Sequence, residues 1–541
     1  MRNALLIGLL CLPGFAKAQH PIDVTHYRFL INLSDSSNRI FGKADIEFRA
    51  QQSARSIEID LGKYDQKGKG MQVTQVGRYG DRKGNQPSRL SFQWISDDRI
   101  RIDLDKPIQK DEEASIWIEY NGIPRDGLII SKNQHGERTF FADNWPNRAH
   151  QWIPCVDDPA DKASVDFIVE APHPYKVVSN GVPTGNSNQV MSNGNSSHYW
   201  IEKVPLPTKV MVIGVARFAV DTVGFFGNTK PVTSWVFPQD SASGFKTYAQ
   251  ALPILEWMNQ YIGPYAYDKL ANVQSKTIFG GMENASAIFY YENSVNGKRD
   301  EEALIAHEIA HQWFGNMAME KSFHHLWLSE GFATYLTHRY MESRYGDSIL
   351  KARLQVDREK INEFLSRTPR SVIDTVANYM SMLNANSYEK GGWVLHMIRK
   401  QVGDQAFQQI IRQYYESFKG KNADTDDFRK VVESITGQDW SVFFDQWLKQ
   451  KVNPSLQIQW ENSADGKSAN LSIRQLQPTE PFSFPLTLDL TPGSGNKKRV
   501  KIQVTKTEET FILPEPGTID SIVVDPETEL LIDKLIVVQK G

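Results

Sequence analysis

The stretch "LIAHEIAHQWFGN", residues 304–316, holds two histidines within a pattern that otherwise reads as an apolar helix face. On an α-helix, His307 and His311 would differ by about 40° in direction and about 6 Å in rise, so both rings can reach one ion. Glu308 would project from the adjoining flank, close enough to take a proton from a water beside that ion. By itself the motif fits either a core helix that contains histidines or a zinc site.

A catalytic zinc site usually has three protein ligands and keeps one position open. A third histidine in the pattern HExxHxxGxxH is excluded, because Phe314 and Met317 occupy the critical positions. Glu330, separated from the motif by eighteen residues, lies among apolar neighbours where an unpaired carboxylate is unfavourable. The spacing lets the first helix end at Gly315 and a second helix return to the ion. We therefore predict one Zn²⁺ ion with three ligands: His307, His311 and Glu330.

The composition is that of a globular protein. The chain has 541 residues, of which 40% are hydrophobic and 23% charged, and a length of about 150 residues per domain predicts three or four domains. The formal net charge of −3 gives no electrostatic reason to expect nucleic acid or an anionic membrane surface as a partner.

The N-terminus has the layout of a secretory signal. "MRNALLIGLLCLPGFAKAQ" contains one basic residue, a short apolar run, a Pro-Gly pair and the small-x-small pattern Ala16-Lys17-Ala18. The apolar run is too short for a membrane anchor, and Leu10 before Cys11 disfavours lipid attachment. We expect removal of residues 1–18 and export to the periplasm or the extracellular space, with no membrane anchor.

If Cys11 is removed with the signal, Cys155 is the single remaining cysteine and no intramolecular disulfide can form. The context of Cys155, "HQWIPCVDDP", is apolar and contains proline. This context favours a small buried hydrophobe over a nucleophile.

Hydrophobic periodicity divides the rest of the chain into three parts. Alternation with period two, as in "RIFGKADIEFRA", "DRIRIDL" and "SIWIEY", predicts an N-terminal antiparallel β-sheet domain over residues 19–217. Apolar residues then recur every three or four positions, which predicts a mainly helical catalytic domain over residues 218–452. Alternation returns and predicts a C-terminal β-sandwich over residues 453–541. The expected fold class is therefore multidomain α+β.

Three motifs in order resemble a known family. HEIAH followed by the distant glutamate, "GGMEN" at 280–284 and "YEKGG" at 388–392 are similar to the zinc aminopeptidases of the aminopeptidase N and leukotriene hydrolase type, the gluzincin aminopeptidases. The resemblance covers most of the chain and implies a thermolysin-like catalytic domain. It implies that Glu308 activates water, that Glu283 binds the substrate's α-ammonium, and that Tyr388 stabilises the tetrahedral oxyanion. The implied substrate-binding residues are Gly280, Gly281, Met282, Glu283 and Asn284.

Two positions depart from the pattern of that family. Trp145 stands where many members carry a Gln or Glu that helps to bind the amine, and Ser329 replaces the usual Asn before the third ligand. The family's large C-terminal helical domain has no counterpart in this sequence, so we expect a bacterial exported short form with a more open cleft. Because indole offers an ammonium no acceptor, the amine would be left to other carboxylates: Asp143 or Asp157, or Glu283 and Glu330 alone.

The resulting prediction is a zinc aminopeptidase that hydrolyses N-terminal residues from peptides through an activated water. Its expected partners are peptides with a free N-terminus. Two alternatives stay open: an inactive or weakly active peptide-binding relative, and a dual aminopeptidase and epoxide hydrolase.

Overall fold

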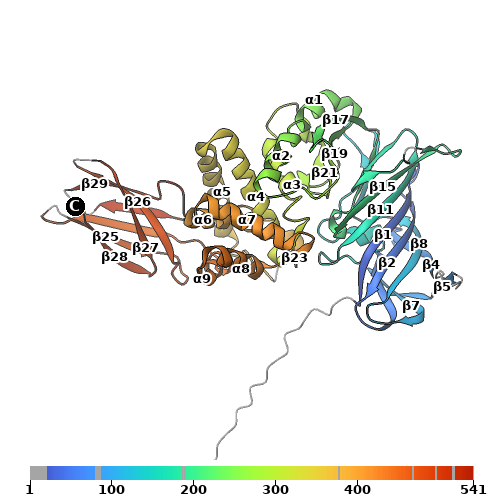
Figure 1. Cartoon of the computed structure of the whole chain (residues 1–541), viewed down its shortest axis with the longest axis horizontal. Coiled ribbons are helices and arrows are strands. Elements are labelled where there is room, and N and C mark those ends of the chain that lie inside the picture. The colour runs from blue at the N-terminus through green and yellow to red at the C-terminus, as the bar shows by residue number, and fades with distance from the viewer. Residues whose placement is uncertain are drawn as a thin grey trace, which may run out of the picture.

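The structure, a computed structural model, describes residues 21–79, 87–185, 187, 189–375, 378–465, 468–493, 496–514 and 518–539. The expected signal peptide and Cys11 lie outside these residues. Figure 1 shows three regions in chain order along an elongated molecule: strands at one end, a helical middle, and further strands at the other end. This order agrees with the predicted α+β class.

The N-terminal region consists of three sheets. The largest has the order β13-β15-β11-β1-β2-β8-β4-β5, with β14 also on β15, and the smaller ones are β12-β16-β10-β9 and β3-β7-β6. The strands are β1 (Ile22–Asn32), β2 (Ile40–Ala50), β3 (Ala54–Asp60), β4 (Gly70–Arg78), β5 (Ser88–Arg89), β6 (Phe92–Ser96), β7 (Arg99–Ile108), β8 (Glu113–Ile123), β9 (Leu128–Lys132), β10 (Arg138–Ala142), β11 (Ala163–Pro172), β12 (Lys176–Ser179), β13 (Val182–Pro183), β14 (Gln189–Val190), β15 (Asn195–Leu206) and β16 (Ile213–Ala216).

Alternation in the N-terminal strands corresponds to burial. In β8, Ile116, Ile118 and Tyr120 are buried while the residues between them are more exposed. One pairing differs from the antiparallel prediction, because β1 runs parallel to β11. These two strands lie far apart in the chain, and local alternation carries no information about their relative direction.

The helical middle opens with a sheet that the sequence interpretation missed. Its order is β17-β18-β19-β21-β20, and β19 runs parallel to both of its neighbours. Every residue of β19 is buried, so the strand shows no alternation that could reveal it. The short strand β20 forms one edge of this sheet. The strands are β17 (Ala219–Phe226), β18 (Lys230–Val236), β19 (Leu270–Ser275), β20 (Gly281–Met282) and β21 (Ala287–Tyr291).

Helices dominate the region from residue 241 to 449. They are α1 (Ser241–Tyr248), α2 (Ala251–Tyr261), α3 (Glu302–Ala310), α4 (Trp327–Tyr345), α5 (Asp347–Arg367), α6 (Gly391–Val402), α7 (Asp404–Phe418), α8 (Thr425–Thr436) and α9 (Ser441–Lys449), with a small pair of strands, β22 (Ala318–Glu320) and β23 (Lys421–Ala423). The sequence interpretation did not anticipate α5. Among the described residues, no helix combines the length and the apolar character needed to span a bilayer.

The first metal-binding helix is shorter than predicted. The expected end was Gly315, but α3 ends at Ala310. The chain then turns, and Gly315 adopts a φ of 115°, a conformation that strongly favours glycine. Its N–H donates to the carbonyl of Ala318 at 2.9 Å, which closes the turn before α4.

Helices α4 and α6 touch through their backbones. A Cβ atom added to Gly331 would lie 2.8 Å from Cα of Gly391, and one added to Gly391 would lie 2.9 Å from Cα of Gly331. Any side chain at either position would force the helices apart. This contact brings the segments around Glu330 and Tyr388 together.

The C-terminal region contains two sheets, β28-β25-β24-β30 and β27-β26-β29. Their predicted apolar faces are buried, with Leu456 and Trp460 in the first sheet and Leu486 and Leu490 in the second. This pattern is the one predicted for a β-sandwich. The strands are β24 (Leu456–Asn462), β25 (Ser468–Gln475), β26 (Phe484–Pro492), β27 (Lys498–Val504), β28 (Glu508–Pro514), β29 (Ile519–Val524) and β30 (Leu535–Gln539).

Cys155 is fully buried in the N-terminal region. Its main chain exchanges two hydrogen bonds with that of Asp60, at 2.8 and 3.1 Å. Burial raises the pKa of the Cys155 thiol well above its ordinary value. The structure therefore supports the interpretation of Cys155 as a small buried hydrophobe rather than a nucleophile.

In a Cys11→Ser variant, we expect Cys155 to resist a water-soluble thiol reagent while the protein is folded, because thiolate is scarce and the reagent has no access. One thiol per chain should react after unfolding in guanidinium. Spectrophotometric thiol titration, with and without denaturant, measures the reactivity of Cys155 in the folded and in the unfolded protein. Reaction of the native protein at the rate of free cysteine would contradict this account.

Candidate metal centre and active site

The three predicted metal ligands converge on one point. Nε2 of His307 and Nε2 of His311 are 3.1 Å apart, and Oε2 of Glu330 lies 3.3 Å from the first and 3.2 Å from the second. Ligand atoms of a tetrahedral site with bonds of about 2.0–2.1 Å are separated by about 3.3 Å. Within the described chain, no hydrogen bond of acceptable geometry reaches the buried Glu330 Oε2. The donor set, its spacing and this unpaired oxygen fit a zinc ion.

Local structure fixes how each ligand points. His307 belongs to α3, while His311 follows its last residue and keeps the helical register through an N–H bond of 3.3 Å to the His307 carbonyl. Nδ1 of His311 lies 3.0 Å from the Phe314 carbonyl oxygen and 3.1 Å from the Ser329 hydroxyl. A proton on Nδ1 leaves the Nε2 lone pair free to bind a metal. Ser329, a departure from the family pattern, therefore contacts a metal ligand directly.

Glu308 lies against the "GGMEN" loop. A Cβ atom at Gly281 would sit 2.2 Å from Oε1 of Glu308, so only glycine allows the carboxylate to occupy this place. Glycine is therefore needed at position 281 because the carboxylate of Glu308, the predicted base, lies so close to the main chain there. Glu308 itself is buried but lines the same cavity as the metal ligands.

The loop is held by the segment that follows α3. Gln312 and Asn316 both donate side-chain N–H groups to the Glu283 carbonyl oxygen, at 3.0 and 2.8 Å. Gln312 also accepts a hydrogen bond from the Ser286 N–H at 2.9 Å. The residues "HQWFGN" therefore position Glu283 relative to the metal ligands.

Tyr388 lies in a π-helical turn, η7 (Asn386–Lys390), just before α6. The Lys390 N–H reaches back five residues to the Ala385 carbonyl at 2.8 Å, an arrangement that is frequent at functional sites. The Tyr388 ring is stacked on that of His307, with centroids 5.9 Å apart and planes inclined by 16°. Burial, and then the carboxylate of Glu330, raise the pKa of Tyr388 well above its ordinary value, so its hydroxyl remains a donor.

A cavity of about 390 Å³ brings these residues together. Asn284, the last residue of the loop, is buried and does not line the cavity, and its side-chain amide has no hydrogen-bond partner in the described structure. Four apolar side chains complete the walls: Trp145, Phe279, Leu304 and Leu383. The predicted residues that line the cavity are Gly280, Gly281, Met282, Glu283, His307, Glu308, His311, Glu330 and Tyr388.

Asp143 does not compensate for Trp145. Its side chain is fully buried, with one oxygen 2.6 Å from Nη2 of Arg148. The other oxygen accepts hydrogen bonds from the Thr277 hydroxyl and the Ile278 N–H, at 3.1 and 3.0 Å. Asp143 therefore joins the N-terminal region to the segment that leads into the "GGMEN" loop, and it does not line the cavity.

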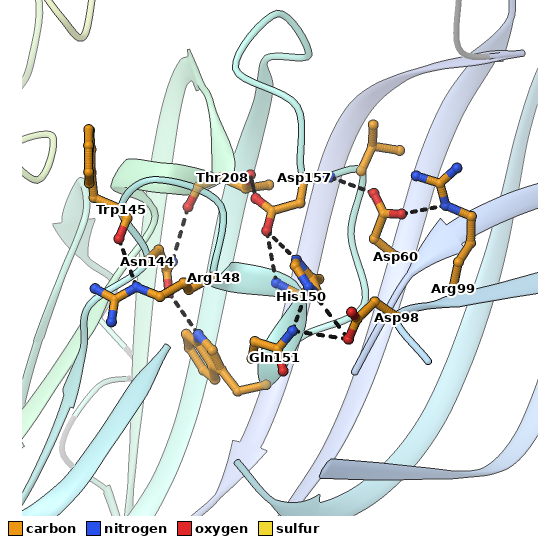
Figure 2. Close-up of polar contacts among 12 residues, drawn as sticks. Asp60, Asp98, Arg99, Asn144, Trp145, Arg148, His150, Gln151, Asp157 and Thr208 are labelled. Carbon is orange, nitrogen blue, oxygen red and sulfur yellow. Dashed lines mark hydrogen bonds and ion pairs between the residues drawn. The ribbon is translucent and has the colours of Figure 1, made fainter. Parts of the chain in front are cut away.

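Asp157 is equally engaged elsewhere. Figure 2 shows it bonded to Nδ1 of His150 at 2.7 Å and to the Thr208 hydroxyl at 2.7 Å. In the same network Nε of Arg148 donates to the Trp145 carbonyl at 2.7 Å, which holds the backbone of the indole residue. Of the proposed amine acceptors, only Glu283 and Glu330 line the cavity.

Two buried charged residues beside the cavity, Lys209 and Glu320, were not predicted from the sequence. Nζ of Lys209 lies 3.8 Å from Oε1 of Glu283 and 3.2 Å from Oε1 of Glu320. A lysine at the start of the apolar run "KVMVIG" could have been flagged as needing a buried partner. No local sequence pattern indicates which carboxylate that partner would be.

Comparison with known proteins agrees with this geometry. Residues 23–210 match the peptidase M1 N-terminal domain, and residues 247–447 match the peptidase family M1 domain. The chain belongs to the peptidase M1 family. The M1 match includes the metal triad, Glu308, the "GGMEN" loop and Tyr388.

Similar M1 proteins come from distant organisms. Glutamyl aminopeptidase of Rattus norvegicus is 23% identical over 85% of this chain and 50% of its own length. Leucyl aminopeptidase of Saccharolobus solfataricus is 24% identical over 73% of the chain and 50% of its own. The leukotriene A-4 hydrolase homolog of Botryotinia fuckeliana is 24% identical over 62% and 57%. The chain thus spans about half the length of these relatives.

In this M1 site, Ser329→Ala is expected to weaken zinc binding by about tenfold, the lower end of the effect of losing a partner of a ligating histidine. The Phe314 carbonyl remains as a second acceptor for His311 and limits the loss. Competition with a chromophoric chelator measures the affinity. Ser343→Ala, on the same helix, removes only a bond to the Tyr340 carbonyl and should leave zinc affinity unchanged. Equal affinities for all three proteins would contradict the role of Ser329.

Proposed function

We propose that this protein is a zinc-dependent aminopeptidase that hydrolyses N-terminal residues from peptides. The observation that carries the proposal is a single cavity lined by the metal triad together with Glu308, Glu283 and Tyr388. Membership of the M1 family and the names of the similar proteins support peptide hydrolysis. The spacing of the three ligand atoms supports zinc.

The protein's own groups would divide the chemistry as follows. A zinc ion held by the triad would supply Lewis-acid polarisation of the scissile carbonyl and make water more acidic. Glu308, held beside Gly281, takes the proton of the attacking water and passes it to the leaving amine. Tyr388 donates its hydroxyl hydrogen to the tetrahedral oxyanion, in which charge develops during the reaction.

Restriction to the N-terminal residue would come from Glu283. Its carboxylate lines the cavity and favours a free α-ammonium over a neutral, blocked N-terminus. The first side chain would contact the apolar walls formed by Trp145, Phe279, Leu304 and Leu383. Among the described strands β20 lies at the edge of its sheet, where outward main-chain groups can hydrogen-bond the peptide main chain.

The domain division and the location are part of the same proposal. Boundaries near 217/218 and 452/453 are supported by the gap between β16 and β17 and by the gap between α9 and β24. Export to the periplasm or the extracellular space rests on the signal-like sequence at residues 1–18.

The proposal is tested with a panel of aminoacyl anilides and their N-acetylated counterparts. We expect free-amine substrates to be cleaved, activity to be lost with a chelator and restored by zinc, and acetylated substrates to be cleaved far more slowly. If no substrate of either kind is cleaved, the peptidase assignment is wrong. Equal cleavage of both kinds would favour an endopeptidase.

Glu308→Gln should lower kcat by about 10²–10⁴, the usual contribution of a positioned base, while the bound zinc stays at one ion per chain. Steady-state kinetics and elemental analysis measure the two quantities. Glu301→Gln, at the start of the same helix and outside the cavity, serves as the matched control. Normal turnover by the Glu308 variant would rule out this base.

Tyr388→Phe is expected to lower kcat by about 10²–10³ because the oxyanion loses one donor. KM should change little, since the hydroxyl acts mainly on the transition state. Kinetics on a single anilide substrate, with zinc content checked, provide the test. A rise in KM with unchanged kcat would instead place the hydroxyl in ground-state binding.

A further inference from the structure

Lys209 is a buried cation directly behind the proposed amine site. It belongs to a short 3₁₀ turn of the N-terminal region, η2 (Thr208–Val210), and only 1% of it is exposed. Lys209 does not line the cavity, whereas Glu283 does. Burial alone would lower the pKa of Lys209, but the carboxylates of Glu320 and Glu283 raise it above its ordinary value, so the group is an ammonium.

Two carboxylates share this one ammonium. Nζ of Lys209 donates a hydrogen bond to Oε1 of Glu320 at 3.2 Å, while Oε1 of Glu283 lies farther away, at 3.8 Å. Glu320 is 1% exposed and Glu283 is 5% exposed. Oε1 of Glu283 has no hydrogen-bond donor in the described structure. Counted as ions, Lys209, Glu283 and Glu320 carry one net negative charge. Glu320 has the hydrogen bond from Lys209, although its Oε2 also has no donor in the described structure, and Glu283 is the carboxylate that faces the cavity without a hydrogen-bonded cation.

Aromatic rings shield this cluster. Nζ of Lys209 lies 5.7 Å from the centroid of the Phe323 ring, and the Trp145 ring packs edge-on against Phe323 at 5.6 Å. The Trp145 indole therefore packs against the Phe323 ring, and the Phe323 ring in turn lies next to the Lys209 ammonium. Water is kept away, and Coulomb interactions among the three charges are correspondingly strong.

A second lysine interacts electrostatically with Glu320 but does not join the cluster. Nζ of Lys162 donates to the main-chain carbonyls of Met317 and Lys421, at 3.1 and 2.9 Å, and burial lowers the pKa of this lysine to about 7. The Lys162 side chain is more exposed than that of Lys209, and the described structure shows no ion pair between Lys162 and Glu283. Of these two lysines, Lys209 is therefore the one that both carboxylates share.

We infer that Lys209 and Glu320 are positioning residues for amine recognition: Glu320 keeps Lys209 paired, so that the charge of Glu283 stays available for the substrate's α-ammonium. The inference rests on the proposed aminopeptidase function. The substrate would then bring the single positive charge that completes a buried cluster of two anions and two cations. Such charge matching favours binding in a water-poor site.

The decisive variant is Glu320→Gln, which keeps the shape of the side chain but removes its charge. Lys209 is then left with Glu283 as its nearest carboxylate and competes with the substrate ammonium. KM for aminoacyl anilides should rise by about tenfold or more, while kcat stays within about twofold of the original value, because neither residue touches the reacting atoms.

The double variant Lys209→Met/Glu320→Gln removes the internal cation together with its partner. Glu283 is then free again, so KM should fall back to within about threefold of the parent protein. A general packing defect would instead worsen as the second substitution is added. Glu342→Gln removes a carboxylate of α4 that pairs with Arg339 and Arg399 and does not line the cavity. This variant is the matched control and should leave KM unchanged.

Thermal melting establishes that each variant is folded before kinetics are compared. The inference is overturned if folded Glu320→Gln protein keeps its KM, if the loss falls on kcat instead, or if the double variant does not recover. Failure of the charge-balanced double variant to fold also overturns it. Absence of any turnover by the parent protein overturns the proposed function as well, which distinguishes the two failures.

Discussion

The backbone contact between α4 and α6 sets the separation between Glu330 and Tyr388, on which the rest of the candidate site depends. Gly331 follows the third metal ligand directly, and Gly391 lies three residues after Tyr388. With no side chain between them, the helices approach until main-chain atoms touch. The separation between a metal ligand and the proposed oxyanion donor is therefore fixed by two rigid helices rather than by loops. A similar restriction acts at Gly281, where the absence of a side chain admits the carboxylate of Glu308.

Charged side chains lie both at the candidate metal centre and farther from it, and the two groups have different partners. The imidazole and carboxylate ligands form the centre, and Ser329 with the Phe314 carbonyl orients one of them. Farther out, the network of Figure 2 engages the carboxylates of Asp157 and Asp60 with partners inside the N-terminal region. Since these acids already have donors, they do not compete for a ligand in the cavity. The carboxylates that face the cavity are Glu283, Glu308 and Glu330, the three that the proposed chemistry uses.

Much of the site could be predicted from the sequence, because short-range geometry determines it. The four-residue spacing of His307 and His311 and the distant Glu330 predicted a triad whose atoms do converge. The missed features depend on long-range contacts. The parallel pairings of β19 join distant segments, and its uniform burial hides the alternation. The position of Lys209 beside Glu320 depends on how two regions of the chain pack, which no local pattern encodes.

Packing between the N-terminal and helical regions also affects whether either region could be separated from the other. Lys209 comes from the N-terminal region, whereas Glu320 and Glu283 come from the helical one. Asn180 and Asp143 also cross this boundary, to the Ala285 carbonyl and the Ile278 N–H. A helical region without the N-terminal region would lack the cation that pairs with these two carboxylates. These contacts couple the two regions, so recombining either with a foreign partner requires transplanting a charge together with the surface.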